Sequence, residues 1–145
     1  MEVRAILEQK GRNVHTVQPG MTVGAAAELM KLHNVGALVV SPDGHRVEGL
    51  YAERDLARDL VRLGPDLLKT RVEEVMQTAL KTCGPGDRLT DVMRTMTRFR
   101  ARHIPVLEQD RLVGLVSIGD VVKARLDELE TETGVLRDRL AGLGG

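Results

Sequence analysis

Ser117, Asp120 and His103 are the residues whose types could do chemistry in this sequence, because a serine, a histidine and an acid can form a catalytic triad. The serine lies in the segment Gly114–Asp120, as Gly-x-x-Ser-x-Gly, and this is not the Gly-x-Ser-x-Gly elbow of hydrolases. Ser117-x-x-Asp120 has instead the spacing of a capping box at the start of a helix. Capping and ligand binding can coexist there, so we keep these side chains as candidates for binding rather than for catalysis.

Other catalytic and metal-binding patterns are missing from the sequence. It has no Walker loop and no Gly-x-Gly-x-x-Gly segment, the two common phosphate-binding loops. The four histidines are dispersed, without the helical or cysteine-paired spacing of metal sites; they are His15, His33, His45 and His103. We therefore expect no metal site, and a protein that is not an enzyme.

Composition argues against several classes of partner. The 145 residues carry 21 Lys plus Arg and 21 Asp plus Glu, whereas nucleic-acid proteins usually carry an excess of positive charge. Only Tyr51 and Phe99 are aromatic, which leaves little to stack on bases. The apolar run Val35–Val40 is far shorter than the ~20 residues of a membrane span. With Cys83 as the single cysteine, we expect a soluble cytoplasmic protein that binds neither nucleic acid nor membrane.

The elements that must position these residues come as a tandem repeat. At an offset of 66 residues, which becomes 65 after one loop deletion, the matched pairs are Thr16 with Thr82, Pro19 with Pro85, Gly20 with Gly86, Met30 with Met96, Val40 with Val106, Gly49-Leu50 with Gly114-Leu115, and Asp55 with Asp120. Upstream, Val3 and Ile6 match Val72 and Val75 at an offset of 69. Each half is too short to fold comfortably alone, so we expect the two to share a core.

Each half has the pattern of a strand, a helix, two strands and a helix. In the second half we expect a short strand over Leu80–Cys83, a helix capped by Asp87 and ending near Arg100, strands over Ile104–Leu107 and Leu112–Val116, and a long helix from about Ile118. In the first half we expect strands over Ala37–Val40 and Val47–Tyr51, and a helix over Glu53–Leu63 that stops at Gly64-Pro65. Thr70-x-x-Glu73 predicts a capping box that opens a short helix over Val72–Met76.

The segment Gly114–Asp120, together with Arg102-His103-Ile104-Pro105-Val106 and Thr82-x-x-Pro85, resembles the cystathionine-β-synthase (CBS) domain. The first half carries the companion segments Asn34–Val40 and Gly49–Asp55. The chain is similar to bacterial stand-alone, nucleotide-binding tandem CBS proteins with a C-terminal helix. The resemblance implies an α+β fold in which each repeat is β-α-β-β-α with a small sheet and helices. It places CBS domain 1 at residues 1–68, CBS domain 2 at 69–128 and a C-terminal helical extension at 129–145.

The resemblance also implies clefts for an adenine nucleotide between the repeats. In the family the Ser/Thr and Asp of the glycine-rich segment hold the ribose, which suits a carboxylate, because its two oxygens can accept from both hydroxyls of a cis-diol. Phosphates often face the positions of Arg102 and His103, which suits the planar fork of arginine. The second-repeat site implied in this way consists of Thr82, Cys83, Arg102, His103, Ile104, Pro105, Ser117 and Asp120. For Cys83 and Ile104 an ordinary place in the core is an equally good interpretation.

The first-repeat site departs from the family pattern, and we expect it to bind more weakly. Its residues are Thr16, Val35, Gly36, Ala37, Arg54 and Asp55. Ala52 stands where the second repeat has Ser117, so one ribose contact is lost. Gly36 and Ala37 stand where the second repeat has Arg102 and His103, which predicts a less positive but roomier cleft. Arg54 is a candidate for phosphate contact or a plain helix-surface residue.

The C-terminal helix carries a heptad seam. Its apolar positions, which alternate in steps of four and three with Thr133 filling one gap, are Val122, Leu126, Leu129, Leu136, Leu140 and Leu143. Gly134 weakens the helix by about 1 kcal/mol. Two interpretations stay open: an amphipathic helix that folds back onto its own module, or an accessory contact in a homodimer, which we favour. The family usually pairs two modules into a flat disc.

The sequence thus predicts a non-catalytic regulatory module that senses an adenine nucleotide in clefts between its two repeats. AMP, ADP, ATP and NAD(H) are the candidate ligands, with S-adenosylmethionine as a further one, and no cofactor is required. A regulated protein partner is expected but not identified by any residue. The alternative is a structural adaptor, a CBS dimer that binds a protein partner without a nucleotide.

Overall fold

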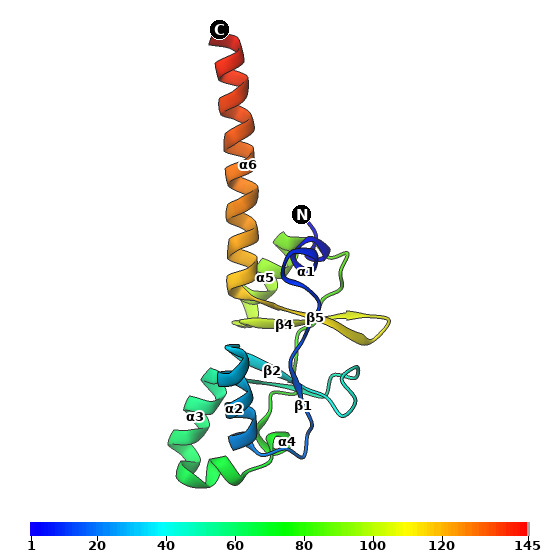
Figure 1. Cartoon of the computed structure of the whole chain (residues 1–145), viewed down its shortest axis with the longest axis vertical. Coiled ribbons are helices and arrows are strands. Elements are labelled where there is room, and N and C mark those ends of the chain that lie inside the picture. Colours follow the sequence, from blue (N-terminus) through cyan, green and yellow to red (C-terminus); the bar gives the residue numbers. More distant parts are fainter. Residues whose placement is uncertain (145) are drawn as a thin grey trace.

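The computed structural model describes the backbone of residues 1–144 and the side chains of residues 1–134. The two halves of the chain stack one above the other, and the last helix projects away from them (Figure 1). The first half contains α1 (Val3–Lys10), β1 (Thr16–Val17), α2 (Val23–His33), β2 (Ala37–Val40), β3 (Gly49–Ala52), α3 (Glu53–Leu63) and the 3-10 helix η1 (Gly64–Lys69). The second half contains α4 (Val72–Val75), α5 (Leu89–Phe99), β4 (His103–Glu108), β5 (Arg111–Ser117) and α6 (Ile118–Gly144).

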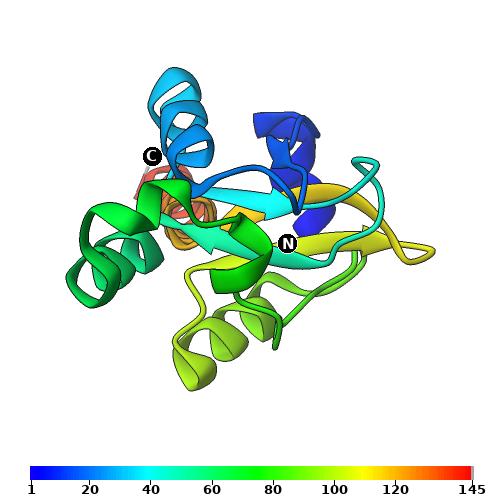
Figure 2. The ribbon, with the colours of Figure 1, turned by 90° about the horizontal axis from the view of Figure 1, so that it is seen from below.

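The described residues form two small sheets. In the first, β1 pairs in parallel with β2, and β2 pairs antiparallel with β3. In the second, β4 and β5 form an antiparallel pair with an irregularity between Val106 and Leu107. The sheets lie over one another at the middle of the molecule, with the helices around them (Figure 2). Between the sheets lies an apolar cluster that joins the halves, and it contains Ala37, Val39, Leu50, Ala52 and Leu112.

The predicted repeat is confirmed for the helices of the two halves. Helix α2 matches α5 at the offset of 66, and the starts of α3 and α6 match at the offset of 65. Both α2 and α5 end at a residue in the left-handed conformation, Asn34 with φ 52° and Arg100 with φ 53°. The α+β fold with a β-α-β-β-α first repeat is therefore as expected.

The predicted strand over Leu80–Cys83 is wrong. Only Cys83 forms a bridge, in parallel, to Val106 of β4. The chain just before it is bound to the other sheet, because Gln77 exchanges backbone hydrogen bonds with Leu50 of β3. Pro85 follows directly and has no N–H to donate, so the pairing cannot continue.

Two predicted caps are also wrong. Asp87 does not cap α5; its carboxylate accepts a hydrogen bond from the N–H of Gly84 at 3.0 Å, within the preceding turn. The box at α4 begins one residue later than expected, since the N–H of Arg71 donates to the carboxylate of Glu74 at 3.0 Å. The Thr70 hydroxyl instead donates to the carbonyl of Asp66 at 2.9 Å, which closes η1.

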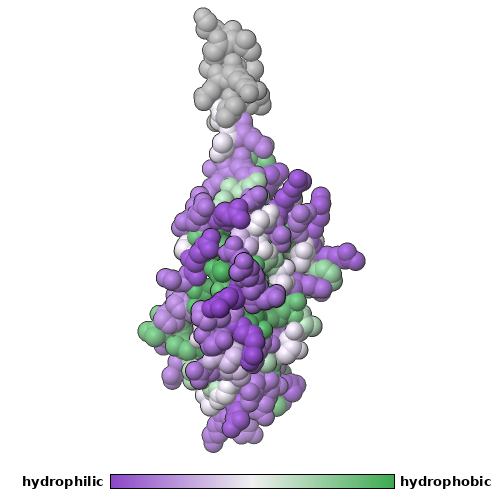
Figure 3. Space-filling view, turned by 90° about the vertical axis from the view of Figure 1, so that its right-hand side faces the viewer, coloured by the Kyte–Doolittle hydropathy of each residue, from purple (hydrophilic) through white to green (hydrophobic). Residues whose placement is uncertain are grey.

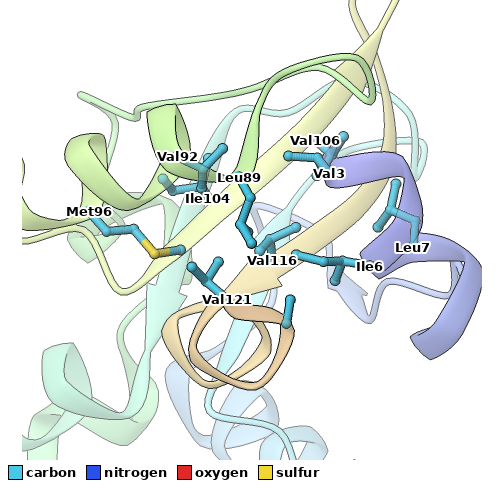
Figure 4. Packing of buried hydrophobic residues seen from close by; sticks show 11 residues of the cluster. Val3, Ile6, Leu7, Leu89, Val92, Met96, Ile104, Val106, Val116 and Val121 are labelled. Carbon is cyan, nitrogen blue, oxygen red and sulfur yellow. The ribbon is translucent and has the colours of Figure 1, made fainter. Parts of the chain in front are cut away.

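The short helices α1 and α4 are exchanged between the halves. The N–H groups of Val3 and Arg4 donate to the carbonyls of Asp87 and Pro85 in the second half. Helix α1 then packs Val3, Ile6 and Leu7 into the second-half core with residues such as Leu89 and Val116 (Figure 4).

Helix α4 makes the matching contacts with the first half. The N–H groups of Val72 and Glu73 donate to the carbonyls of Met21 and Pro19, and Val72 is buried in the first-half core. The two cores therefore do not follow the order of the sequence. The boundaries at residues 68 and 128 remain a prediction.

Helix α6 has one face in the core and one face open. Val121 and Ala124 are buried in the second-half core. Val122, Leu126 and Leu129, the described part of the predicted seam, are 50%, 53% and 41% exposed, so they do not fold back onto their own module. Leu136, Leu140 and Leu143 lie outside the residues whose side chains the structure describes.

On the face shown in Figure 3, apolar side chains are scattered among polar ones over the body.

No helix among the described residues combines the length and the hydropathy that crossing a membrane requires.

Candidate functional site

Two clefts lie where the halves of the molecule meet. The larger, which we call the Asp55 cleft, has a volume of about 1010 Å³. Its walls come from the start of α3, from the segment between α4 and α5, and from the junction of α5 with β4. They consist of Gly36, Leu50, Arg58 and residues 52–55, 76–81 and 99–103.

The smaller, which we call the Ser117 cleft, has a volume of about 410 Å³. Its walls come from the C-terminal end of α1, from the turn between α2 and β2, and from the end of β5. They consist of Lys10, His103, Leu115, Ser117 and residues 13–15 and 34–37.

Each cleft combines residues of both repeats. Asp55 and Arg54 of the first repeat share their cleft with Arg102 and His103 of the second. Ser117 of the second repeat faces Val35, Gly36 and Ala37 of the first. The physical reason is that the halves stack face to face, so the β4 start of one repeat lies across from the α3 start of the other.

The structure divides the predicted first-repeat site between the two clefts. Arg54 and Asp55 line the Asp55 cleft together with Arg102, whereas Ala37 lines the Ser117 cleft. It is the Ser117 cleft that lacks an arginine among its walls. Which site binds more tightly remains a prediction.

Asp120 lies at the start of α6, next to the Ser117 cleft, and forms the reciprocal capping box that its spacing predicted. The Ser117 N–H donates to Oδ2 of Asp120 at 2.9 Å, and the Asp120 N–H donates to Oγ of Ser117 at 3.1 Å. Nζ of Lys10 also donates to Asp120 Oδ2, at 2.6 Å, and to the carbonyl of Leu115 at 2.8 Å. Burial raises the pKa of Asp120, but the hydrogen bonds from Lys10 and Ser117 outweigh it, so this pKa lies below its ordinary value.

The other oxygen of Asp120, Oδ1, accepts no hydrogen bond from the described part of the chain. The side chain of Asp120 remains 23% exposed. A ligand hydroxyl can therefore bind Oδ1 without breaking the cap.

Asp55 starts α3 in the same way but is more completely engaged. The Ala52 N–H donates to its Oδ2 at 2.9 Å, as the Ser117 N–H does to Asp120. Nε2 of Gln77 donates to the same oxygen at 2.7 Å, and Arg58 pairs with Oδ1 at 3.3 Å. Ala52 has no hydroxyl, so the reciprocal half of the box is absent from this repeat.

Arg58 ties Asp55 to a second buried acid. Its Nε lies 3.4 Å from Oδ1 of Asp59, which is 1% exposed. The buried Tyr51 donates its hydroxyl to Oδ2 of Asp59 at 3.1 Å. Burial and the neighbouring Asp59 raise the pKa of Tyr51, so it stays a donor. This network fixes α3 against β3 and holds the carboxylate of Asp55 at the cleft.

His103 and Gly36 line both clefts. A β-carbon at Gly36 would lie 3.6 Å from Nε2 of His103 and 3.7 Å from a carboxylate oxygen of Glu53, so the ring sits against this glycine. Burial lowers the pKa of His103, and the charge of Lys10 lowers it further, against the opposite effect of Asp120, Glu53 and Asp55. The imidazole is therefore a neutral group at neutral pH, in contact with both clefts.

Six of the predicted site residues line neither cleft, and one of them, Asp120, lies next to the Ser117 cleft. Thr82 is exposed beyond the end of the Asp55 cleft, and Thr16 follows His15 without reaching the Ser117 cleft. Ile104 is buried in the second-half core, and Pro105 is buried on the same strand. Cys83 packs against that core, where burial raises the pKa of its thiol to about 12. For Ile104 and Cys83 the structure thus shows the core position that the sequence left open.

Sequence reasoning missed Lys10, Gln77 and His15. Lys10 and Gln77 each bind one of the two acids; Lys10 is the last residue of the exchanged helix α1, and Gln77 follows the exchanged helix α4. His15 lines the Ser117 cleft and stacks on His33, with ring centroids 3.8 Å apart. No local motif marks these residues; the matches of Val3 with Val72 and of Ile6 with Val75 are the signal that the exchanged segments are equivalent.

Among the described residues, no group of three or more His, Cys, Asp or Glu side chains could hold a metal ion.

Two stacked repeats, each with an acid at a strand-to-helix boundary and with clefts between them, define a tandem domain pair. The family model for the CBS domain matches residues 3–62 and 72–127, and the chain belongs to this family as a CBS pair. Among curated proteins it is 40% identical over 108 residues to the CBS domain-containing protein YhcV of Bacillus subtilis, covering 74% of this chain and 76% of that one.

Solved structures agree with this assignment. The CBS-domain containing protein ATU1752 of Agrobacterium tumefaciens superposes with a TM-score of 0.83 at 39% identity, over 86% of this chain and 99% of that one. The structure of CBSX2 in complex with AMP superposes with a TM-score of 0.71 at 26% identity, over 87% of this chain and 96% of that one. The fold is that of CBS pairs, some of which bind adenine nucleotides.

Proposed function

We propose that this protein is a non-catalytic sensor that binds an adenine nucleotide in the clefts between its CBS repeats. The observation that carries the proposal is the acid at each cleft. Asp120 keeps Oδ1 free beside Ser117 at the start of α6, and Asp55 lies in the wall of the larger cleft. A carboxylate of this kind can accept hydrogen bonds from the two hydroxyls of a ribose.

The comparisons support the class of ligand. AMP is bound by CBSX2, which shares this fold at 26% identity. In this chain AMP, ADP, ATP and NAD(H) all remain candidates, and we propose no further cofactor. S-adenosylmethionine stays a less favoured candidate.

A sensor needs two states that bind the ligand with different affinity. The Lys10–Asp120 ion pair is a contact that a ribose at Asp120 would have to share or displace. Lys10 ends α1, which is packed into the second-half core. We therefore propose that nucleotide binding changes the contacts of this helix and, through them, acts on a homodimer or a regulated protein partner.

One observation favours the alternative, a structural adaptor that binds a protein partner without a nucleotide. Both oxygens of Asp55 are engaged by the chain itself, and Ala52 supplies no hydroxyl. In that case neither cleft would take up a nucleotide.

Binding measurements separate the two functions. We expect AMP, ADP, ATP or NAD to raise the melting temperature of the full chain, since a ligand at a hundredfold excess over its dissociation constant stabilises by about 2.7 kcal/mol. Asp120→Ala should weaken nucleotide binding in calorimetric titration by roughly 1.5–3 kcal/mol, the contribution of hydrogen bonds to a charged group. Asp87→Ala is the matched control, because Asp87 accepts a backbone N–H but lines neither cleft. A chain that no adenine compound stabilises would be an adaptor.

A further inference from the structure

Positive charge is distributed unequally between the two clefts. The Asp55 cleft has five cationic side chains and two carboxylates in its walls, a formal excess of three positive charges. The cations are Arg54, Arg58, Lys81, Arg100 and Arg102. Among the described residues, Lys10 is the one formally charged side chain that lines the Ser117 cleft, and Asp120 neutralises it at 2.6 Å.

Most of the charge in the Asp55 cleft is available to a ligand. In the part of the chain that the structure describes, Arg54, Lys81, Arg100 and Arg102 form no ion pair. All four are exposed, and Nζ of Lys81 lies 3.9 Å from the centre of the Phe99 ring. Arg58 is the one of the five cations that the described residues hold in ion pairs, with Asp55 and Asp59.

The four free cations come from three separate segments. Arg54 is in the first turn of α3, Lys81 is in the connection from α4 to α5, and Arg100 and Arg102 lie in the junction between α5 and β4. Like charges gathered around one concave surface repel one another and concentrate a positive field there. A ligand that brings several negative charges relieves this repulsion.

We infer that the Asp55 cleft takes an adenine nucleotide with at least two phosphates, whereas the Ser117 cleft takes an adenosine group with at most one. This inference rests on the proposed function and names the ligand class of each cleft. A single phosphate brings about −1.5 to −2 charges at pH 7, which leaves part of the positive excess unmatched. A second or third phosphate supplies the negative charge that matches the remaining excess. The Asp55 cleft, with a volume of about 1010 Å³, also has more room for a longer ligand than the Ser117 cleft, with about 410 Å³.

Calorimetric titration of the full chain with adenosine, AMP, ADP and ATP tests this inference. ATP should bind the wild-type chain at least about tenfold more tightly than AMP, because each added phosphate gains charge-assisted hydrogen bonds. In Arg100→Gln/Arg102→Gln the ratio should fall to about threefold or less, while adenosine binds as before. Arg94→Gln is the matched control, an exposed arginine on α5 that pairs with Asp91 outside both clefts, and it should keep the wild-type ratio. Lys81→Gln serves as a second variant if the double variant does not fold.

Three results would overturn the inference while leaving the proposed function intact. These are equal affinity for AMP and ATP in the wild type, a ratio that survives in both variants, and inorganic tripolyphosphate binding as tightly as ATP, which would mark a general polyanion surface. Absence of binding by every adenine compound would instead refute the proposed function itself.

Discussion

Asp55 and Asp120 occupy matched positions in the two repeats, but their neighbours differ. Each accepts the N–H of the residue three positions before it at 2.9 Å, so each holds the start of a helix. Asp55 is then covered by Gln77 and Arg58, whereas Asp120 meets Lys10 and keeps one oxygen free. One duplicated residue has thus been placed in two different electrostatic settings by the segments packed against it.

Two further single residues, His103 and His15, make the free energy of unfolding depend on pH. Burial is the main cause that lowers both pKa values below 6.5, so below about pH 6.5 the unfolded chain binds more protons than the folded one. Stability should therefore be full well above this pH and decrease as the pH falls from above 6.5 toward the lowered pKa values of the two histidines. Urea unfolding of the ligand-free chain across this range measures the effect, and His103→Asn should flatten the profile.

His45→Asn is the control for this profile, because His45 is exposed in the turn before β3. An unchanged slope in His103→Asn would contradict the assignment. The pKa of Asp120 is lowered from its ordinary value of 3.8, so the effect of this carboxyl on stability falls below the pH window of the histidines.

At the scale of elements, two glycines make the exchange of α1 and α4 possible. Gly114 of β5 lies against Leu7 of α1, where an added β-carbon would be 2.5 Å from a leucine methyl group. Gly49 of β3 lies against the segment after α4, where an added β-carbon would collide with the side chain of Met76 and come within 2.9 Å of the Gln77 carbonyl. Each strand therefore needs a residue without a side chain at this position.

We expect Gly49→Ala to destabilise the protein more than Gly114→Ala. At Gly49 the obstacle includes backbone, which cannot move aside, whereas at Gly114 it is the end of a leucine side chain. Overpacking of this kind typically costs about 1–3 kcal/mol, and we place Gly49→Ala at the upper end and Gly114→Ala at the lower. Denaturant unfolding of both variants, with Gly20→Ala as control because nothing lies within 4 Å of it, measures the difference. The reverse order would show that α1, not α4, is the more rigidly held helix.

At the scale of the whole molecule, the open face of α6 predicts assembly. Ile118, Val122, Leu126 and Leu129 are between 41% and 53% exposed on one helix, although the opposite face of that helix is buried. Apolar side chains gathered in this way usually mark an interaction surface. The described part of the predicted seam is thus an open apolar face, and its contact with a second copy of the chain remains a prediction.

We therefore expect the full chain to sediment as a homodimer at micromolar concentration. Val122→Gln/Leu126→Gln should raise the dimer dissociation constant by about tenfold or more, because two apolar contacts are lost. A chain ending at Leu129 should dimerise more weakly but bind nucleotide as before, since neither cleft contains a later residue. Leu32→Gln, on the exposed side of α2, is the control. A monomeric wild-type chain would refute the prediction.

The sequence by itself determined the repeat, the types of most elements and the two acids. These are local properties: the spacing of apolar residues predicts helices and strands, and an acid three residues after a strand end predicts a cap. The helix over Glu53–Leu63, the strand over Ala37–Val40 and the start of α6 at Ile118 follow from such patterns. The strand expected at Leu80–Cys83 is reduced to the single bridge of Cys83 with Val106, because Gln77 before it pairs with Leu50 of the other sheet.

Only the tertiary structure decided which residues meet. Arg102 faces Asp55, Ser117 faces Gly36, and Lys10 binds Asp120, although in each pair the partners lie in different halves of the chain or far apart in the sequence. These contacts arise when the two halves stack and exchange α1 and α4, and no spacing within one repeat encodes them. The charge of each cleft, and with it the proposed preference for phosphates, is a property of that stacking.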